Sequence, residues 1–443
     1  MTCLFLENPV SSNISANSDI PIPNPYRAIL RREIPEPLIA LLCFILGIWM
    51  WDHYFGETAG YAPGTEQIAL IKIDRDMQLA EAMADDPSFL RWLAHAQTTD
   101  EALAGGMRSL EMLRKEQVLE PEACRAYSAL IATRDGAPVS RYLASFNLPD
   151  EDSPPPTWWN LKIATANFEF ALNDRTTTLR TRAVVVGSII WGLGLIGLVF
   201  LPAAIRCLRG AFRNKPAGYS SAWNPSLGIV VFLVATLAWI GFSMVVELGI
   251  MQFPGIHPVL AILLDTAARI LPTLIALALL FKKASHIPRT IGLNGHIHTP
   301  LLLGLLSLLV LIDQPLRWAL GRFTAEDPTG GLSYADSGIF GLVFLIVSSC
   351  IFAPLAEETL YRGILHRSLA NRMGVLGGAL LSSVIFASLH FYDWYGLASV
   401  ATFGFICALT YQSTGSLINV VALHMLYNTS ITLPEWTIYH APL

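Results

Sequence analysis

Long apolar runs without a single charged residue constrain this chain more than any other feature. Residues 183–205 and 225–246 contain no Asp, Glu, Lys or Arg. An α-helix needs about 20 such residues to cross the hydrocarbon core of a bilayer, and a membrane span must satisfy its backbone hydrogen bonds internally. Seven further apolar runs, two of them short, lie at 37–51, 256–281, 300–312, 337–356, 374–391, 397–411 and 416–433. The sequence therefore predicts an all-α polytopic membrane protein with about nine transmembrane helices.

The composition agrees with this fold class and excludes several others. Of 443 residues, 53% are hydrophobic and 14% are charged, whereas an ordinary soluble domain has about 25% charged residues. The net charge is −5 and no basic patch is present, so a nucleic-acid partner is not expected. The six cysteines stand singly without CxxC spacing, which argues against a zinc-finger type of site.

The positions of basic residues predict the orientation in the membrane. Cytoplasmic loops carry an excess of Lys and Arg. Such residues precede the first predicted span and follow the second, fourth and sixth, at 27–32, 206–215, 282–289 and 362–372. Alternation of the spans puts all four groups on one side, so we expect a cytoplasmic N-terminus in a bacterial inner membrane. A polar leader precedes the first span and no small-residue cleavage site follows it, so this span is not expected to be a cleaved signal peptide.

A polar insert separates the first two predicted spans, over residues 52–182. It contains 20 acidic and 13 basic side chains, and the predicted orientation puts it outside the cytoplasm. Residues 79–134 indicate several amphipathic helices, with breaks expected at Asp85-Asp86-Pro87, Gly105-Gly106 and Glu120-Pro121. We expect a mainly helical packing domain that could also dock a partner.

Ionisable groups within the apolar C-terminal runs are the strongest functional signal. Such groups are expensive in a membrane and suggest a functional site. Glu357 and Glu358 are adjacent, and Arg362 follows Glu358 by four residues with the acid first, which favours an ion pair on one helix face. Glu357 then points about 100° away and has no partner in its own helix. Asp313 lies near the end of its run, and we expect it to reach water and to have no chemical role.

Two later helices carry further polar groups that are expected at the same depth. His390 follows Glu357 by 33 residues, and the midpoint lies in the turn signal at 371–374. In a helical hairpin, both side chains then lie about 25 Å along the helix from the turn. A second turn at 412–416 sends back a helix with His424 and Asn428 on one face. We therefore expect Glu357, His390, His424 and Asn428 to converge in one cavity.

These residue types suit the hydrolysis of a peptide bond by water. The chain shows no convincing Ser or Cys nucleophile, so a carboxylate that activates water is the natural base. Histidine and asparagine side chains can supply hydrogen-bond donors to the oxyanion that develops during hydrolysis. Glu357, His390 and His424 are also plausible zinc ligands, but the helical HExxH signature is absent. A metal-free site is favoured, and bound zinc remains the alternative.

Three ordered motifs resemble those of a known family. The motifs EExxxR, FxxxH and HxxxN stand at 357–362, 386–390 and 424–428. The region 340–433 is similar to the CAAX-protease and bacteriocin-processing (CPBP, or Abi) intramembrane proteases, which include type II CAAX prenyl endopeptidases.

The resemblance implies an intramembrane endopeptidase and assigns a role to each motif residue. Glu357 would be the base that activates water, with the help of His390. Glu358 and Arg362 would orient and tune it, while His424 and Asn428 would donate hydrogen bonds to the oxyanion.

The expected domain organisation and two rival functions follow. The chain divides into a polar leader (1–36), a first transmembrane helix (37–51) and the insert (52–182). Transmembrane helices that precede the core (183–336), the CPBP-like catalytic core (337–433) and a C-terminal tail (434–443) follow. The substrate would be a peptide or protein at the bilayer, and prenylated CAAX peptides are one option. The rivals are a non-catalytic membrane partner of the same fold, such as a scaffold or bacteriocin-immunity-like protein, and an ion-coupled transporter.

Overall fold

The computed structural model describes ten segments of the chain, and all regular structure within them is helical. These segments are 34–55, 65–116, 118–137, 157–163, 169–213, 223–252, 258–320, 338–390, 392 and 394–439. Most of the predicted leader and the last four residues of the predicted tail lie outside them.

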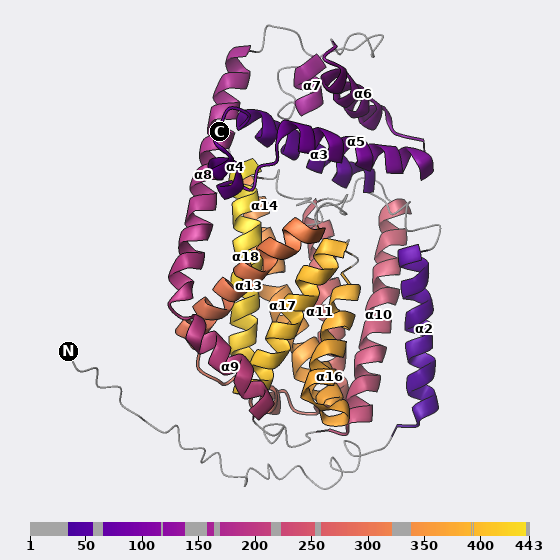
Figure 1. Ribbon diagram of the computed structural model, residues 1–443. Coiled ribbons are helices and arrows are strands. Elements are labelled where there is room, and N and C mark those ends of the chain that lie inside the picture. Colours follow the sequence, from indigo (N-terminus) through magenta and orange to yellow (C-terminus); the bar gives the residue numbers. More distant parts are fainter. Residues whose placement is uncertain are drawn as a thin grey trace, which may run out of the picture.

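A bundle of long helices forms the body of the protein (Figure 1). Its members include α2 (Glu36–Phe55), α8 (Glu169–Leu198), α10 (Pro225–Gln252), α11 (Pro258–Leu280), α13 (Thr299–Leu320), α16 (Arg367–Ser388), α17 (Trp394–Thr414) and α18 (Leu417–Tyr439). Among the described residues, four helices are long and apolar enough to span a membrane, or five if one bent pair counts as a span. Large apolar side chains such as Phe44, Ile189 and Phe340 are exposed on the outside, as expected where lipid is the solvent. The chain is thus an all-α membrane protein, while the number of nine spans stays a prediction.

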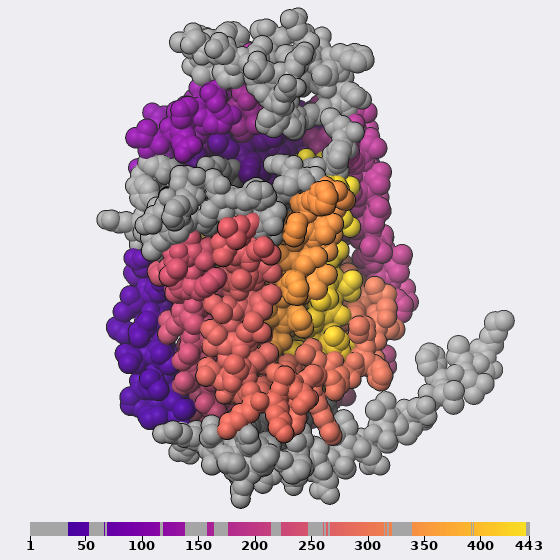
Figure 2. Space-filling view, turned by 180° about the vertical axis from the view of Figure 1, so that it is seen from behind, coloured from indigo at the N-terminus to yellow at the C-terminus, as the bar shows by residue number. Residues whose placement is uncertain are grey.

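The C-terminal helices lie at the centre of the bundle and also reach its surface. Phe232, Tyr361, Phe386 and Tyr411 belong to one buried cluster that joins α10 to the C-terminal helices. From behind, residues of the C-terminal part (orange to yellow) are visible beside the salmon-coloured helices, with α2 at one flank (Figure 2). The preceding helices therefore support the core without enclosing it.

The span predicted at 183–205 corresponds to a candidate membrane span at Thr176–Leu198, but its predicted end is wrong, because the helix breaks before residue 205. Helix α8 ends at Leu198, and α9 begins at Leu201 and runs to Arg213. Pro202 stands in the first turn of α9, where its missing N–H is tolerated but would interrupt a continuous helix. The break lets the carbonyl oxygen of Phe200 approach Gly304 of α13, where a Cβ atom would lie 2.4 Å from it.

Both predicted turns of the C-terminal core are confirmed. Helix α16 bends sharply at Gly374, which has φ 83° and ψ 167°, a conformation that is essentially restricted to glycine. Between α17 and α18, Gly415 has a φ of 65°. The chain therefore runs back at both places, as the convergence of the motifs requires.

The described part of the insert is a layer of helices that covers one end of the bundle (Figure 1). It contains α3 (Thr65–Ala82), α4 (Ser88–Leu93), α5 (Thr99–Glu116), α6 (Pro121–Asp135) and α7 (Trp158–Ile163). The breaks expected at residues 85–87 and 120–121 are confirmed. The break expected at Gly105-Gly106 is wrong, because α5 continues through it. A Cβ atom on Gly106 would lie 3.2 Å from both Ile73 and Leu130, so this glycine permits close packing of α5.

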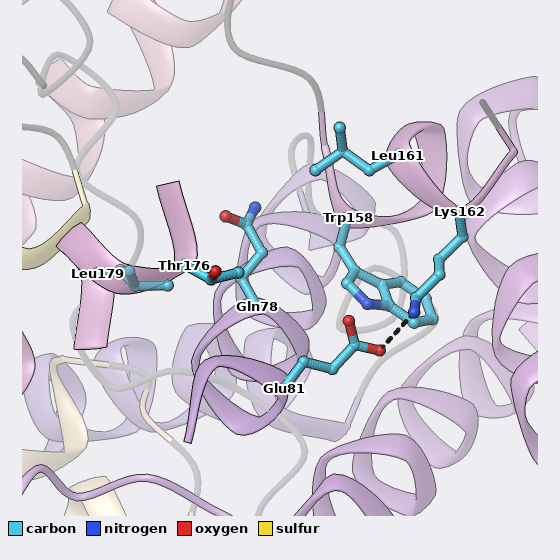
Figure 3. Close-up of a pocket in the computed structure, with 7 residues that line it drawn as sticks. All are labelled: Gln78, Glu81, Trp158, Leu161, Lys162, Thr176 and Leu179. Atoms are coloured by element: carbon cyan, nitrogen blue, oxygen red, sulfur yellow. Dashed lines mark ion pairs between the residues drawn. The ribbon is translucent and has the colours of Figure 1, made fainter. Parts of the chain in front are cut away.

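The insert packs against α8 and α18. Arg75 of α3 forms an ion pair with Glu435 and lies 4.9 Å from the ring centre of Tyr439. A small cavity of about 60 Å³ lies between α3, α7 and residues 176–179 of α8. Lys162 and Glu81 form an ion pair of 3.0 Å at its wall (Figure 3). The insert is therefore coupled to the helix that carries His424 and Asn428.

Candidate active site

Glu357 and Glu358 lie in a short α-helical segment between two π-helical segments. The α-helix α15 (Ala353–Glu358) follows η7 (Ile346–Phe352) and precedes η8 (Thr359–His366). In η7, the N–H of Ala353 donates to the carbonyl oxygen of Ser348, five residues earlier. Single π-helical turns inside α-helices are frequent at functional sites. They also shift the register of the side chains that follow, which a regular 3.6-residue repeat does not predict.

Pro354 and Asn428 together explain how this irregular helix keeps its hydrogen bonds. In the π-helical pattern, the next donor to the carbonyl oxygen of Ser349 would be residue 354, but proline has no N–H. Instead, Nδ2 of Asn428 donates to the Ser349 oxygen at 2.7 Å. Because a buried carbonyl group needs a partner, Asn428 ties α18 to the helix that carries Glu357. One of its two amide hydrogens is committed to this bond.

Glu358 lies at the centre of a buried charged network. Its side chain is 0% exposed and that of Arg362 is 1% exposed. Oε1 of Glu358 accepts hydrogen bonds from Nη1 of Arg362 at 2.9 Å and from Nδ1 of His424 at 2.7 Å. The guanidinium group of Arg362 also lies over the ring of Phe386, 4.3 Å from its centre. The i,i+4 pair predicted from the sequence is confirmed, and it also orients the imidazole of His424.

Hydrogen bonds fix the protonated nitrogen of both histidines. Nδ1 of His390 lies 2.7 Å from the carbonyl oxygen of Phe386. Since a carbonyl oxygen only accepts, Nδ1 carries the hydrogen, and Nε2 of neutral His390 is an acceptor. The same holds for His424, because its Nδ1 donates to a carboxylate that also binds an arginine. Both Nε2 atoms thus present lone pairs.

Glu357 faces both of these lone pairs. Its Oε2 atom lies 3.9 Å from Nε2 of His390 and 3.9 Å from Nε2 of His424. These distances are too long for direct hydrogen bonds but suit a bridging group. Three lone-pair donors converge, so the group between them would be a hydrogen-bond donor such as water, or a cation. Glu357 and His390 are partly exposed, so the space between them is not sealed from the surface of the bundle.

The spacing of these three side chains does not fit a zinc site as it stands. With bonds of about 2.0–2.1 Å, tetrahedral zinc holds its ligand atoms about 3.3 Å apart, whereas Oε2 of Glu357 lies 3.9 Å from each Nε2. No group of three His, Cys, Asp or Glu side chains in the described segments has the spacing of a metal site. We therefore derive no step through a metal.

The structure brings five of the six predicted site residues into one connected group. Glu357, Glu358, Arg362, His390 and His424 are linked by the contacts above. Asn428 lies one turn beyond His424 on α18, and its observed bond reaches the backbone of η7.

A hydroxyl network beside the site was not predicted from the sequence. Asp313 of α13 accepts hydrogen bonds from the hydroxyl groups of Tyr395 and Ser399, each at 2.7 Å. Ser399 also lies 3.2 Å from the hydroxyl group of Tyr427. The Tyr427 ring stacks on Phe403 with centres 4.7 Å apart, and Phe403 contacts the His424 ring edge-on. The i,i+4 spacing of Tyr395 and Ser399 is the signal that could have pointed to a partner for Asp313.

An apolar groove of about 640 Å³ opens next to the site. It runs between α16 and α17 and is lined by Leu320, Val384, Ala387, Ser388, Trp394, Leu397, Ala398 and Ala401. Ser388 directly precedes the turn that ends in His390. The groove could therefore hold an apolar group close to that histidine.

Comparisons with known proteins match the same region of the chain. Residues 339–430 match a family model described as "Type II CAAX prenyl endopeptidase Rce1-like". A protein of Escherichia coli, known only as an uncharacterized 24.3 kDa protein, is 32% identical over 96 residues, which cover 21% of this chain and 44% of that protein. The chain thus spans less than half the length of the curated relative it matches. No solved structure matches it. Residues 339–430, which contain all three motifs, therefore support an assignment of this region to the CAAX-protease family.

Proposed function

We propose that the protein is an intramembrane endopeptidase that hydrolyses peptide bonds with water activated by Glu357. The observation that carries this proposal is the convergence of the Glu357 carboxylate with two imidazole lone pairs, each at 3.9 Å. A water molecule placed there can donate one hydrogen to Glu357 and the other to His390. Its oxygen lone pair then points away from both and is free to attack.

The reaction needs no group beyond the side chains of the site and water. The water oxygen attacks the carbonyl carbon of the peptide bond while its proton passes to Glu357. The C–N bond then breaks, and Glu357 returns the proton to the leaving nitrogen. The products are a carboxylic acid and an amine, which become carboxylate and ammonium when the proton passes between them, and Glu357 is again ionised. Glu358 and Arg362 act by holding His424, and we regard them as positioning residues.

Two donors are proposed for the oxyanion. Asn428 has a second amide hydrogen besides the one bound to Ser349. His424 can donate from Nε2 only as an imidazolium, because its neutral form carries the hydrogen on Nδ1. The Glu358 carboxylate would stabilise that imidazolium, as the buried aspartate does in a Ser-His-Asp triad.

Cleavage is expected to continue after metal removal. Dialysis of purified protein against a chelator should leave the rate unchanged within about twofold, because water needs no ion when a carboxylate removes its proton. The measurement pairs the cleavage rate with the zinc content determined by mass spectrometry. One zinc per chain, together with loss of cleavage on chelation and its return with added zinc, would contradict the metal-free mechanism.

We propose that the preferred substrates carry a large apolar group next to the cleaved bond. The groove is lined mostly by alanine, leucine and tryptophan, and its lining includes Ser388, two residues before His390. Burial of apolar surface in such a groove favours binding by about 25 cal/mol per Å². A lipid chain or a bulky aliphatic side chain would fit this description.

Filling the groove should discriminate between substrates. An Ala398→Trp variant is expected to lower kcat/KM about tenfold or more for peptides with a bulky apolar flank. Peptides with a small flank should be affected much less. Leu380→Trp is the control, because Leu380 is exposed on α16 and does not line the groove. Equal losses for both peptide classes would show that the groove does not select substrates.

The proposed activity is tested most directly in cells. A deletion strain is complemented with either the wild-type protein or the Glu357→Ala variant, and the peptides in the two membranes are compared. Peptides that end at a shared cleavage site should be present with the wild-type protein and absent with the variant. If the variant folds normally and retains full biological activity, the protein is a non-catalytic partner. Ion-coupled uptake in proteoliposomes that peptides do not affect would instead favour a transporter.

The proposed setting is the bacterial inner membrane, with the N-terminus in the cytoplasm. The ion pair between Arg372 and Glu36 joins the start of α2 to the end of the bundle opposite the insert. Basic residues 282, 283 and 289 follow α11 in the chain. This placement supports a cytoplasmic location for that end by the positive-inside rule, and it would put the insert outside.

A further inference from the structure

The short helix α4 of the insert leaves two large aromatic side chains open. Phe89 is 63% exposed and Trp92 is 49% exposed. Their rings are stacked with centres 5.9 Å apart. No other Phe, Tyr or Trp is exposed among the described residues of the insert from 65 to 163. A contiguous exposed apolar patch on a protein usually marks an interaction surface.

Helix α4 is fixed against the membrane helix α8 at three levels. Arg180 donates from Nε and Nη2 to the two carboxylate oxygens of Asp86, at 2.5 Å each, and this hydrogen bond lowers the pKa of Asp86. The carbonyl group of Leu93 packs on Gly187, where a Cβ atom would lie 2.1 Å from its oxygen. The ring of Trp92 stacks on Trp191 with centres 4.2 Å apart.

These contacts show how far α4 follows α8. From residue 180 to residue 191, an α-helix rises by about 16 Å. Helix α4 therefore lies beside α8, at the end of the bundle that the insert covers (Figure 1).

The apolar surface around α4 is continuous with a lipid-facing surface. Residues 176–198 of α8 are long and apolar enough to span a membrane. Large apolar side chains on this stretch, such as Val185, Ile189 and Leu193, are exposed. Phe89 and Trp92 extend this surface on the side of the insert.

The segment that follows α4 also contacts the end of α18. Ala94, just after α4, packs in a cluster with Ile438 and Tyr439 at the end of α18. Helix α4 therefore lies beside the end of α18 that faces the insert.

We propose that Phe89 and Trp92 insert into the interfacial layer of the bilayer and anchor the insert to the membrane surface. Trp is enriched at this depth because its ring is amphipathic. Amphipathic helices that lie in the interface bury their apolar face about 5–10 Å deep. The partner of this surface is phospholipid, and the proposal does not depend on the proposed peptidase activity.

Photo-crosslinking in defined bilayers tests this anchor. The full chain is reconstituted in phosphatidylethanolamine–phosphatidylglycerol nanodiscs with p-benzoylphenylalanine in place of Phe89. Mass spectrometry should find at least about tenfold more phospholipid adduct at residue 89 than at residue 134. Arg134 is the control, because it is exposed on α6, which lies farther from the bundle than α3 (Figure 1). The same photoreactive residue at position 189 provides the positive control in the membrane span.

The other outcomes decide against the proposal. An adduct at residue 189 without one at residue 89 would place α4 in water. A protein adduct at residue 89 in native membranes, without lipid adduct in nanodiscs, would assign the surface to a protein partner. A Phe89→Ser variant, which keeps the stacking of Trp92 on Trp191, should increase the hydrogen exchange of α4 in nanodiscs, whereas Met112→Ser, at another exposed apolar position, should not. Unchanged exchange of α4 in Phe89→Ser would also overturn the anchor.

Discussion

The Glu357→Gln variant is expected to fold normally and to lose peptide cleavage by about 10²–10⁴-fold. Glutamine keeps the size of the side chain but cannot accept the proton of water. The neighbouring contacts tolerate the change, because Glu357 makes no direct hydrogen bond to His390 or His424 at 3.9 Å. The rate is measured with purified protein and a peptide identified from the membrane comparison, and the fold is measured by thermal unfolding in the same detergent.

The matched control is Glu36→Gln, at the opposite end of the bundle. Glu36 is exposed and pairs only with an exposed arginine in the described part of the chain, so this variant should retain the wild-type rate. If Glu357→Gln retains more than about a tenth of the wild-type rate, Glu357 does not act as the base. Loss of thermal stability in Glu357→Gln would mean that the rate reports on folding, and Glu357→Asp would then replace it as the test.

Replacement of Arg362 by Met should destabilise the protein by about 3–5 kcal/mol. Both members of its ion pair are almost fully buried, so removal of the arginine leaves the charge of Glu358 without its partner. Denaturant or thermal unfolding in detergent measures the loss. Because Glu358 also accepts the hydrogen bond of His424, the variant should lose cleavage as well.

A second ion pair provides the comparison. Arg372 and Glu36 form an exposed pair, with side chains 41% and 66% exposed, and such pairs contribute about 0–1 kcal/mol. Arg372→Met should therefore have a small effect. Replacement of both Glu358 and Arg362 by Met should recover much of the stability without activity, since an apolar pair of similar volume tolerates burial. Equal effects of Arg362→Met and Arg372→Met would show that the buried pair is not important for stability.

The sequence predicts the helical fold and the convergence of the motif residues, because both follow from the lengths of apolar runs and from the spacing of residues along them. Uncharged runs identify helices by length alone, and Gly374 and Gly415 mark the turns because they adopt backbone conformations that favour glycine. Glu357 and His390 are about equally far in sequence from the turn at 371–374, so their side chains lie at the same level of the helical hairpin. The Glu358–Arg362 pair follows from the i,i+4 rule.

Other features depend on contacts between distant segments and could not be predicted. The spacing does not reveal that Arg75 binds Glu435, 360 residues later. Nor does it show that the Phe386 carbonyl fixes the tautomer of His390. Asp313 illustrates the limit well, since the sequence does not reveal that it binds two hydroxyl groups of α17.

The bond from Asn428 to the backbone of Ser349 has a consequence for biosynthesis. These two residues are 79 positions apart, and α18 is the final helix that the structure describes. A nascent chain that has not yet delivered this helix lacks both His424 and the donor that completes η7. Under the proposed function, the site is therefore complete only after α18 has been translated and has packed against η7.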